Sequence, residues 1–98
     1  MSIQINFDNA LRHAMRLQQL AGEHRTAATR LEAAARDAGA RWRDPAGDEY
    51  VMRANALAAR MRRSADSLSR LGSDITGAAR AYKATEEANQ RAAKKLQR

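Results

Sequence analysis

Cysteine is absent from the 98-residue chain, and aromatic residues are scarce, with one Phe, two Tyr and one Trp. Without Cys the chain has neither a disulfide framework nor thiolate ligands for a metal ion. A chain this short buries only a modest core, and few aromatic side chains make its packing surface shallow. The sequence therefore predicts one small domain, residues 1–98, that depends on a partner chain for part of its stability.

Long apolar runs are also missing. No stretch approaches the about 20 consecutive apolar residues that a transmembrane helix requires. The opening sequence, MSIQINFDNALRHAMRLQQLAGEHR, has no basic start followed by an apolar stretch and a small-residue cleavage site. We therefore expect a soluble chain, made in the cytoplasm without a cleavable signal peptide.

The motifs of catalytic and cofactor sites are missing as well. The sequence has no Gly-rich phosphate loop and no His grouped with carboxylates at ligand spacing, and its two histidines, His13 and His24, are too far apart on one helix to share a metal ion. A thin helical protein also has no cleft that shields a reaction from water. We predict no enzyme activity, no small-molecule substrate, no cofactor and no metal site.

The first half of the chain has helical periodicity. Apolar positions recur at alternating spacings of three and four, which predicts an amphipathic helix over about 7–39. Asn6 or Asp8 can cap its start, and Gly39, which tolerates positive φ, can end it. The face predicted to be buried consists of Phe7, Ala10, Ala14, Leu17, Ala21, His24, Ala28, Leu31, Ala35 and Ala38.

The second half repeats this pattern and predicts another helix over about 45–87. Asp44 is expected as its N-cap, and Pro45 suits its first position, where no N–H donor is needed. The face predicted to be buried consists of Tyr50, Ala54, Leu57, Met61, Ser64, Leu68, Leu71, Ile75, Ala78 and Tyr82. Beyond it the sequence becomes polar and basic, so residues 88–98 are expected to be loosely ordered.

A connection of about 40–44 between two long helices forces an antiparallel hairpin, and the predicted fold class is therefore all-α. Carboxylates placed one turn from arginines, as in the pairs Glu32 with Arg36 and Arg62 with Asp66, are expected to stabilise each helix from within. The apolar surface is wider than one helix can cover, so we expect two hairpins to pair into a four-helix bundle. The residues expected at that partner interface are Phe7, Leu11, Met15, Leu17, Leu20, Leu31, Leu57, Met61 and Leu68.

Two short stretches carry a family resemblance: WRDPAGDEY at the turn and AYKATEE late in the second helix. Together with the length and the two long helices, they resemble the WXG-hundred, or ESAT-six-like, superfamily of small helical-hairpin proteins of type VII secretion systems. The family has Trp, any residue and Gly at the turn. Here Trp42 is followed by Asp44 in place of that Gly, then by Pro45, and a glycine arrives only at Gly47.

The resemblance implies a non-catalytic type VII secretion substrate or secretion partner, secreted or held at the cell surface. Tyr82 and Glu86 match the family's Tyr-x-x-x-Asp/Glu pattern and would form an export signal read by the membrane ATPase of the secretion machine. The partner hairpin would be a second copy, an acidic sister protein or the helical N-terminal domain of a larger toxin, and in the last case this chain would be a targeting subunit or chaperone. The net charge of +7 favours an acidic partner.

Trp42 and Tyr82 each also have a simpler structural explanation. Trp42 can plug the open end of the hairpin, with its indole N–H bonded to a carbonyl, and a plug of this kind is compatible with partner contact. Tyr82 falls on the predicted buried face of the second helix and can be ordinary packing.

The basic charge leaves one role of another class open, that of a nucleic-acid-associated helical protein. Arg53, Arg60, Arg63 and Arg70 fall near one side of the second helix, and the C-terminal tail is basic. No aromatic residue interleaves with these arginines, and no recognition-helix geometry is apparent, so nucleic acid is the less favoured partner. A third hypothesis is that the protein is a purely structural coiled-coil adaptor in the cytoplasm.

Overall fold

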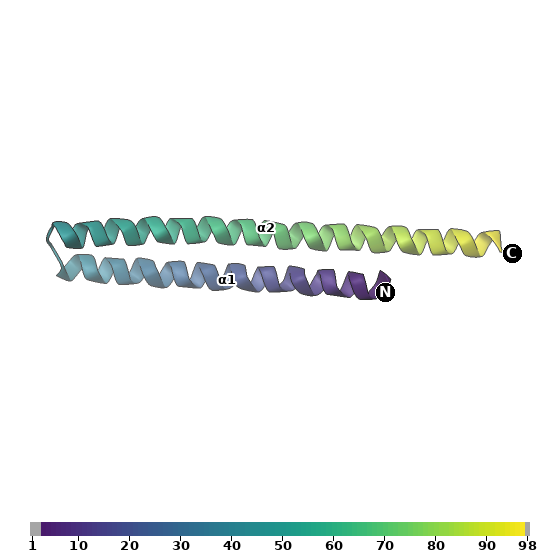
Figure 1. Ribbon diagram of the computed structural model, residues 1–98, viewed down its shortest axis with the longest axis horizontal. Coiled ribbons are helices and arrows are strands. Elements are labelled where there is room, and N and C mark those ends of the chain that lie inside the picture. The colour runs from purple at the N-terminus through teal and green to yellow at the C-terminus, as the bar shows by residue number, and fades with distance from the viewer. Residues whose placement is uncertain (1–2, 98) are drawn as a thin grey trace.

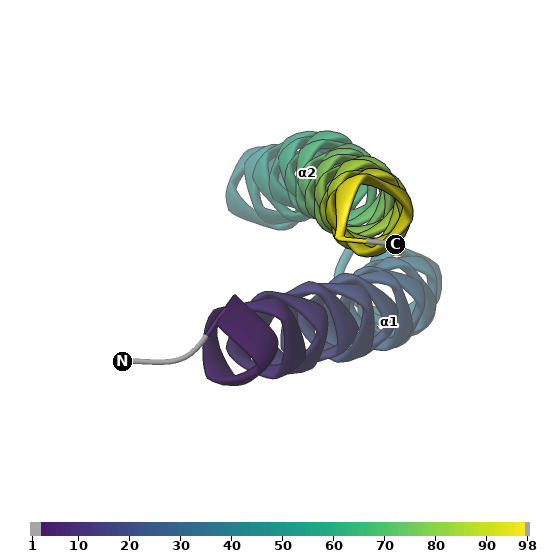
Figure 2. The same cartoon turned by 90° about the vertical axis from the view of Figure 1, so that its right-hand side faces the viewer.

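The computed structural model describes the backbone of residues 3–97 and the side chains of residues 6–97. It consists of two helices, α1 (Ile3–Arg41) and α2 (Pro45–Leu96), which run antiparallel and side by side (Figure 1). The molecule is 82 Å long and 16 Å wide, and an end-on view shows a single pair of inclined helices (Figure 2). The predicted all-α hairpin is confirmed, whereas pairing into a four-helix bundle remains a prediction.

The first helix is longer at both ends than the sequence predicts. It begins at Ile3, so neither Asn6 nor Asp8 is its N-cap, and it continues through Gly39 to Arg41. No residue in the described part of the chain has positive φ, so Gly39 is not a left-handed cap. The helical pattern reaches the turn itself, because the N–H of Trp42 bonds the carbonyl oxygen of Ala38 at 2.7 Å.

The second helix also continues further, through Leu96. Its last nine residues were expected to be loosely ordered, but they are helical. They include Ala, Gln, Arg and Lys, which are among the best helix formers, so they extend an existing helix at little cost. Because α2 has 52 residues and α1 has 39, α2 projects past the start of α1 by about 20 Å (Figure 1).

Small residues form the contact between the helices. Four alanines of α1 are fully buried and lie seven residues apart, so they form one row along the helix. A Cβ atom added to Gly72 of α2 would lie 3.0 Å from the carbonyl oxygen of Ala14, which shows how closely the backbones approach. The buried residues are Ala14, Ala21, Ala28 and Ala35 of α1 and Gly47, Ala54, Ala58, Ala65 and Gly72 of α2.

The buried face predicted for α2 is largely wrong. Leu57 and Leu71 keep 48% and 49% of their surface exposed, and Ser64 is exposed as well. The physical reason is the alanine row on α1, because only small side chains allow two helices to come this close. The larger residues of α2 are therefore displaced to the flank of the contact, and Ala58, Ala65 and Gly72 take their place.

Candidate functional site

Polar side chains close one edge of the hairpin, here named the polar edge. The side-chain amide of Gln18 donates to the carbonyl oxygen of Ser69 at 2.8 Å and accepts from its hydroxyl at 2.9 Å. Arg62 bonds Glu32, and it also donates to the hydroxyl of Thr29 at 3.1 Å. The pairs that link the two helices along this edge are Gln18–Ser69, Arg25–Asp66 and Glu32–Arg62.

The polar edge was not foreseen from the sequence. We expected Glu32 to pair with Arg36 and Asp66 with Arg62 inside their own helices, but Glu32 and Asp66 each bond an arginine of the other helix, at 3.0 Å for Arg25–Asp66. The seven-residue spacing of Gln18, Arg25 and Glu32 was the available signal. Spacing alone does not tell whether such a row faces solvent or a neighbouring helix.

The opposite edge of the hairpin is apolar. Residues four positions after the buried alanines form the polar edge, as Arg62 and Ser69 do after Ala58 and Ala65. Residues three positions after them flank the buried row on its other side, because a helical turn has about 3.6 residues. This apolar edge comprises Leu17, Leu20, Ala27 and Leu31 of α1 and Tyr50, Leu57, Met61, Leu68, Leu71, Ile75 and Tyr82 of α2, and the half-buried His24 interrupts it on α1.

Most of the predicted interface residues lie on the apolar edge, but three do not. Phe7 belongs to the row of Ala14, seven residues before it, and Leu11 lies seven residues before Gln18 of the polar edge. Met15 is exposed and lies on the same side of α1 as Thr29, whose hydroxyl accepts a hydrogen bond from Arg62 of the polar edge. The members that lie on the apolar edge are Leu17, Leu20, Leu31, Leu57, Met61 and Leu68.

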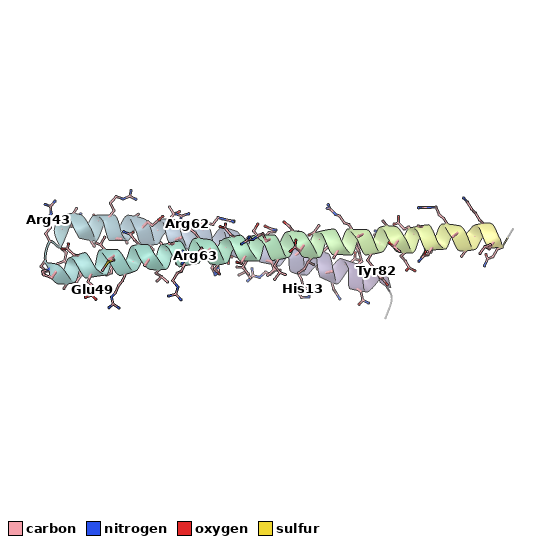
Figure 3. All side chains as sticks on the ribbon, turned by 90° about the horizontal axis from the view of Figure 1, so that it is seen from above. His13, Arg43, Glu49, Arg62, Arg63 and Tyr82 are labelled. Carbon is pink, nitrogen blue, oxygen red and sulfur yellow. The ribbon has the colours of Figure 1, made fainter. Side chains whose placement is uncertain are left out.

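An apolar groove of about 400 Å³ lies at the end of the apolar edge where α1 begins. The ammonium group of Lys83 lies 4.5 Å from the ring centroid of Phe7, a cation–π contact that holds this part of α1 against α2. Figure 3 shows Tyr82 beside the first turns of α1. The residues that line the groove are Asn6, Phe7, Ala10, Ile75, Ala78, Ala79 and Tyr82.

Tyr82 and Glu86 lie one turn apart on α2, shortly before this helix passes the start of α1. Tyr82 has 54% of its surface exposed, so packing within the hairpin uses only part of its ring. Glu86 is half-buried. Tyr82 therefore presents part of its ring at the apolar groove, whereas Glu86 is not among the residues that line it.

The Trp turn is built around the start of α2. Asp44 is the N-cap, since its carboxylate accepts from the N–H of Gly47 at 2.8 Å, and Pro45 is the first helical residue, both as predicted. The ring of Trp42 lies over Gly47 and 6.0 Å from the ring of Tyr50, measured between centroids. Trp42 also keeps 44% of its surface exposed. It thus packs on the first turn of α2 and still presents part of its ring to solvent.

The arginines of α2 differ in their exposure and in their partners. Arg53 bonds Glu49 of its own helix at 2.7 Å. Arg62 belongs to the polar edge, whereas its neighbour Arg63 is exposed (Figure 3). Among the described residues, no salt bridge includes Arg60, Arg63 or Arg70. These three side chains leave an unpaired positive strip on the helix surface.

The described side chains do not assemble a metal centre. They include no cluster of three or more His, Cys, Asp or Glu residues that could hold a metal ion. The Nδ1 atom of His24 lies 2.9 Å from the carbonyl oxygen of Leu20, a distance that suits an N–H donating to that carbonyl. In the described part of the chain, neither helix has a stretch apolar enough to cross a membrane.

The comparison with known families agrees with this arrangement. The model of the WXG100 family, described as proteins of 100 residues with WXG, matches residues 2–87. No curated protein and no solved structure matches the chain significantly. The matched region contains the apolar edge, the Trp turn and both residues of the C-terminal Tyr-x-x-x-Glu pattern. The chain therefore belongs to the WXG100 family of small helical proteins associated with type VII secretion.

Proposed function

We propose that the protein is a non-catalytic type VII secretion substrate or secretion partner that acts as one half of a four-helix bundle. The observation that carries this proposal is the difference between the two edges of the hairpin. One edge is closed by polar contacts, and the other leaves leucines, Ile75 and Tyr82 without a helix to cover them. An exposed apolar surface of this kind marks a protein–protein contact, because covering it contributes about 25 cal/mol per Å².

The C-terminal part of α2 would carry the export signal. Tyr82 lines the groove, Glu86 follows one turn later, and beyond them α2 continues as an exposed helix that a receptor can reach from several sides. Trp42 lies at the other end of the hairpin, about 55 Å away along α2. One hairpin therefore cannot present both features to one receptor site, whereas a reversed second hairpin can supply the Trp turn.

Export from the host tests this proposal directly. The amount of protein in the culture medium is compared between strains with and without a working type VII ATPase, with a cytoplasmic protein as the lysis marker. We expect the protein in the medium only when the ATPase works, and a loss of about tenfold or more for Tyr82→Ala. Asn89→Ala is the matched control, since Asn89 is exposed on the same helix outside the signal.

Equal amounts of protein in the medium with and without the ATPase would contradict the proposal. Retention in the cells in every strain would do so as well. Helix content and dimer content of Tyr82→Ala are measured by circular dichroism and sedimentation, so that a folding defect is not mistaken for a lost signal.

The unpaired strip of Arg60, Arg63 and Arg70 supports a second candidate of another class, binding to nucleic acid. Such binding neutralises phosphates and releases counterions, so it weakens steeply as salt increases. Retention of the protein on duplex DNA at about 50 mM salt, lost on raising the salt, would favour this role. Absence of retention would remove it and leave the export role alone.

A further inference from the structure

One side of α2 carries positive charge along much of its length. Arg63 and Arg70 come five residues after the buried Ala58 and Ala65, and five residues turn a helix by about 140°, so both arginines point away from α1. Arg91 lies twenty-one residues after Arg70, at the same heptad position, and continues this row. The side of α2 so formed, here named the basic face, consists of the exposed residues Arg63, Arg70, Arg80, Arg91, Lys94 and Lys95.

The cations of the basic face have no counter-charge within the hairpin. Among the described residues, no salt bridge includes any of them. The acids beside this face are Asp66, which Arg25 of α1 neutralises at 3.0 Å, and the exposed Asp74 and Glu87. Positive charge is therefore in excess on this side of α2. The excess is greatest beyond Glu87, where the described chain contains bases and no acid.

The outer side of α1 has no face of a single charge. Arg16, Glu23, Arg30 and Asp37 alternate in sign at intervals of seven residues. A negatively charged surface would therefore attract the hairpin by α2 and leave the outer side of α1 in water. The basic face is also separate from the apolar edge, so it stays open when a partner covers that edge.

The basic face is straight and has no apolar anchor. The helix is unbroken from Pro45 to Leu96, and the part from Arg63 to Lys95 is about 48 Å long (Figure 1). Between the cations lie small residues such as Gly77 and Ala84, without an aromatic or large apolar side chain. Contact through this face therefore depends on charge and on a partner that is negative over a length of several helical turns.

An anionic lipid bilayer fits these features better than other polyanions do. Its headgroups form a flat, negatively charged layer, so every cation of a straight row can lie beside one. The phosphates of a nucleic-acid duplex follow curved strands, and a straight helix of this length meets them only where it crosses a strand. A folded acidic protein would need apolar anchors at the centre of its interface, and the basic face supplies none.

We propose that the basic face of α2 binds the surface of an anionic lipid bilayer, with the helix lying parallel to that surface. This binding goes beyond the proposed function, which does not require it. The contact is peripheral and electrostatic, so salt screens it over a Debye length of about 8–10 Å. Tyr82 comes nine residues before Arg91, which places it on the opposite side of the helix. A hairpin bound in this way keeps Tyr82 turned toward the solution.

Sedimentation of the purified full chain with lipid vesicles tests the proposal. Vesicles of phosphatidylcholine with about 30% phosphatidylglycerol are compared with pure phosphatidylcholine at about 0.1 M NaCl. We expect binding to the anionic vesicles only, and its loss at about 0.5 M NaCl. The triple variant Arg91→Gln, Lys94→Gln, Lys95→Gln is expected to lower the partition coefficient about 100-fold, because each base near a bilayer contributes about fivefold.

The matched control removes the same charge from the outer side of α1, by Arg12→Gln, Arg16→Gln and Arg30→Gln. These three arginines are exposed, and we expect the partition coefficient to change by less than about threefold. Equal losses in the two triple variants would show that binding follows the net charge and not the basic face, which overturns the proposal. Absence of binding to anionic vesicles, or equal binding to neutral ones, overturns it as well. Circular dichroism checks that both variants keep their helix content.

The orientation on the bilayer is tested with single spin labels, since the chain has no cysteine of its own. Ala84→Cys places the label on the basic face, seven residues before Arg91, and Ala33→Cys places it on the outer side of α1, five residues after the buried Ala28. Vesicle binding should reduce the access of a water-soluble relaxation agent to the label at position 84 and leave that at position 33 unchanged. Equal protection of both labels would contradict binding through α2.

Duplex DNA in the same buffer separates the bilayer from a nucleic acid. Tighter binding to the duplex than to the anionic vesicles, lost in the triple variant of α2, would assign the basic face to nucleic acid and overturn the proposal. The export experiment is independent of these results. Export that requires the ATPase and Tyr82 keeps the proposed function whatever the vesicles show.

Discussion

Trp42 and Gly47 are in contact across the turn, and the contact leaves no room for a side chain at position 47. A Cβ atom built on Gly47 would lie 2.2 Å from the carbonyl oxygen of Trp42 and 2.7 Å from its Cγ atom. The φ angle of Gly47 is not positive, so the need for glycine comes from space and not from backbone conformation. The chain thus keeps a Trp–Gly contact although Asp44 stands two residues after the tryptophan.

Gly47→Ala is expected to lower the free energy of unfolding by about 2 kcal/mol, because the clash involves backbone and a ring at the start of α2. Urea unfolding followed by circular dichroism at fixed protein concentration measures the change. A loss below about 0.5 kcal/mol would show that the turn opens easily and that Trp42 is not seated on Gly47.

Gly22→Ala and Gly77→Ala should have the opposite effect. Apart from the adjoining residues and the nearby backbone of the same helix, no heavy atom lies within 4 Å of a Cβ atom built at either position, and both residues are inside helices. Alanine reduces the entropy cost of helix formation, so each variant is expected to gain about 0.5–1 kcal/mol in the same unfolding measurement. Destabilisation at either site would indicate that it contacts a second chain, which a matched experiment at lower concentration would reveal.

The hairpin and its turn could be predicted from the sequence because their signals are local. Asp44 and Pro45 mark the start of α2 whatever surrounds them, and the apolar periodicity of each half requires only its own helix. The side of α2 that meets α1 could not be predicted in the same way. Leu57 and Leu71 were expected to be buried, but the alanine row of α1 selects small residues, and that choice depends on both helices together.

The site was predicted unevenly for a related reason. Tyr82 and Glu86 were singled out because they resemble the family's Tyr-x-x-x-Asp/Glu pattern, and their role in export stays a prediction. Leu11 and Met15 were assigned to the same interface as Leu17, but they lie on the other side of the helix contact. Apolar character does not distinguish the two edges of a hairpin. The distinction became visible only through the bonds from Arg25 and Arg62 across the polar edge.

Ala28→Leu tests the close packing of the helices. Ala28 is fully buried, and a leucine there forces α1 and α2 apart, so we expect a loss of about 2 kcal/mol in the free energy of unfolding. Ala33→Leu is the control, since Ala33 is exposed on the same helix and leucine and alanine have similar helix propensities. Similar effects of the two variants would contradict the alanine row as the contact surface.

Arg62 and Arg63 are adjacent in the sequence, and the structure predicts different outcomes for their replacement by alanine. Arg62 bonds Glu32 and Thr29 of α1, with both members of the ion pair about 40% exposed (41% and 39%), whereas Arg63 has no salt bridge among the described residues. Arg62→Ala should lower the free energy of unfolding by about 0.5–1 kcal/mol at low salt, and less at about 0.5 M NaCl because salt screens a half-exposed pair. Arg63→Ala should change it by less than about 0.5 kcal/mol. Equal effects would mean that Arg62 acts through the overall charge of α2, which both variants reduce by the same amount, and not through its bonds to α1.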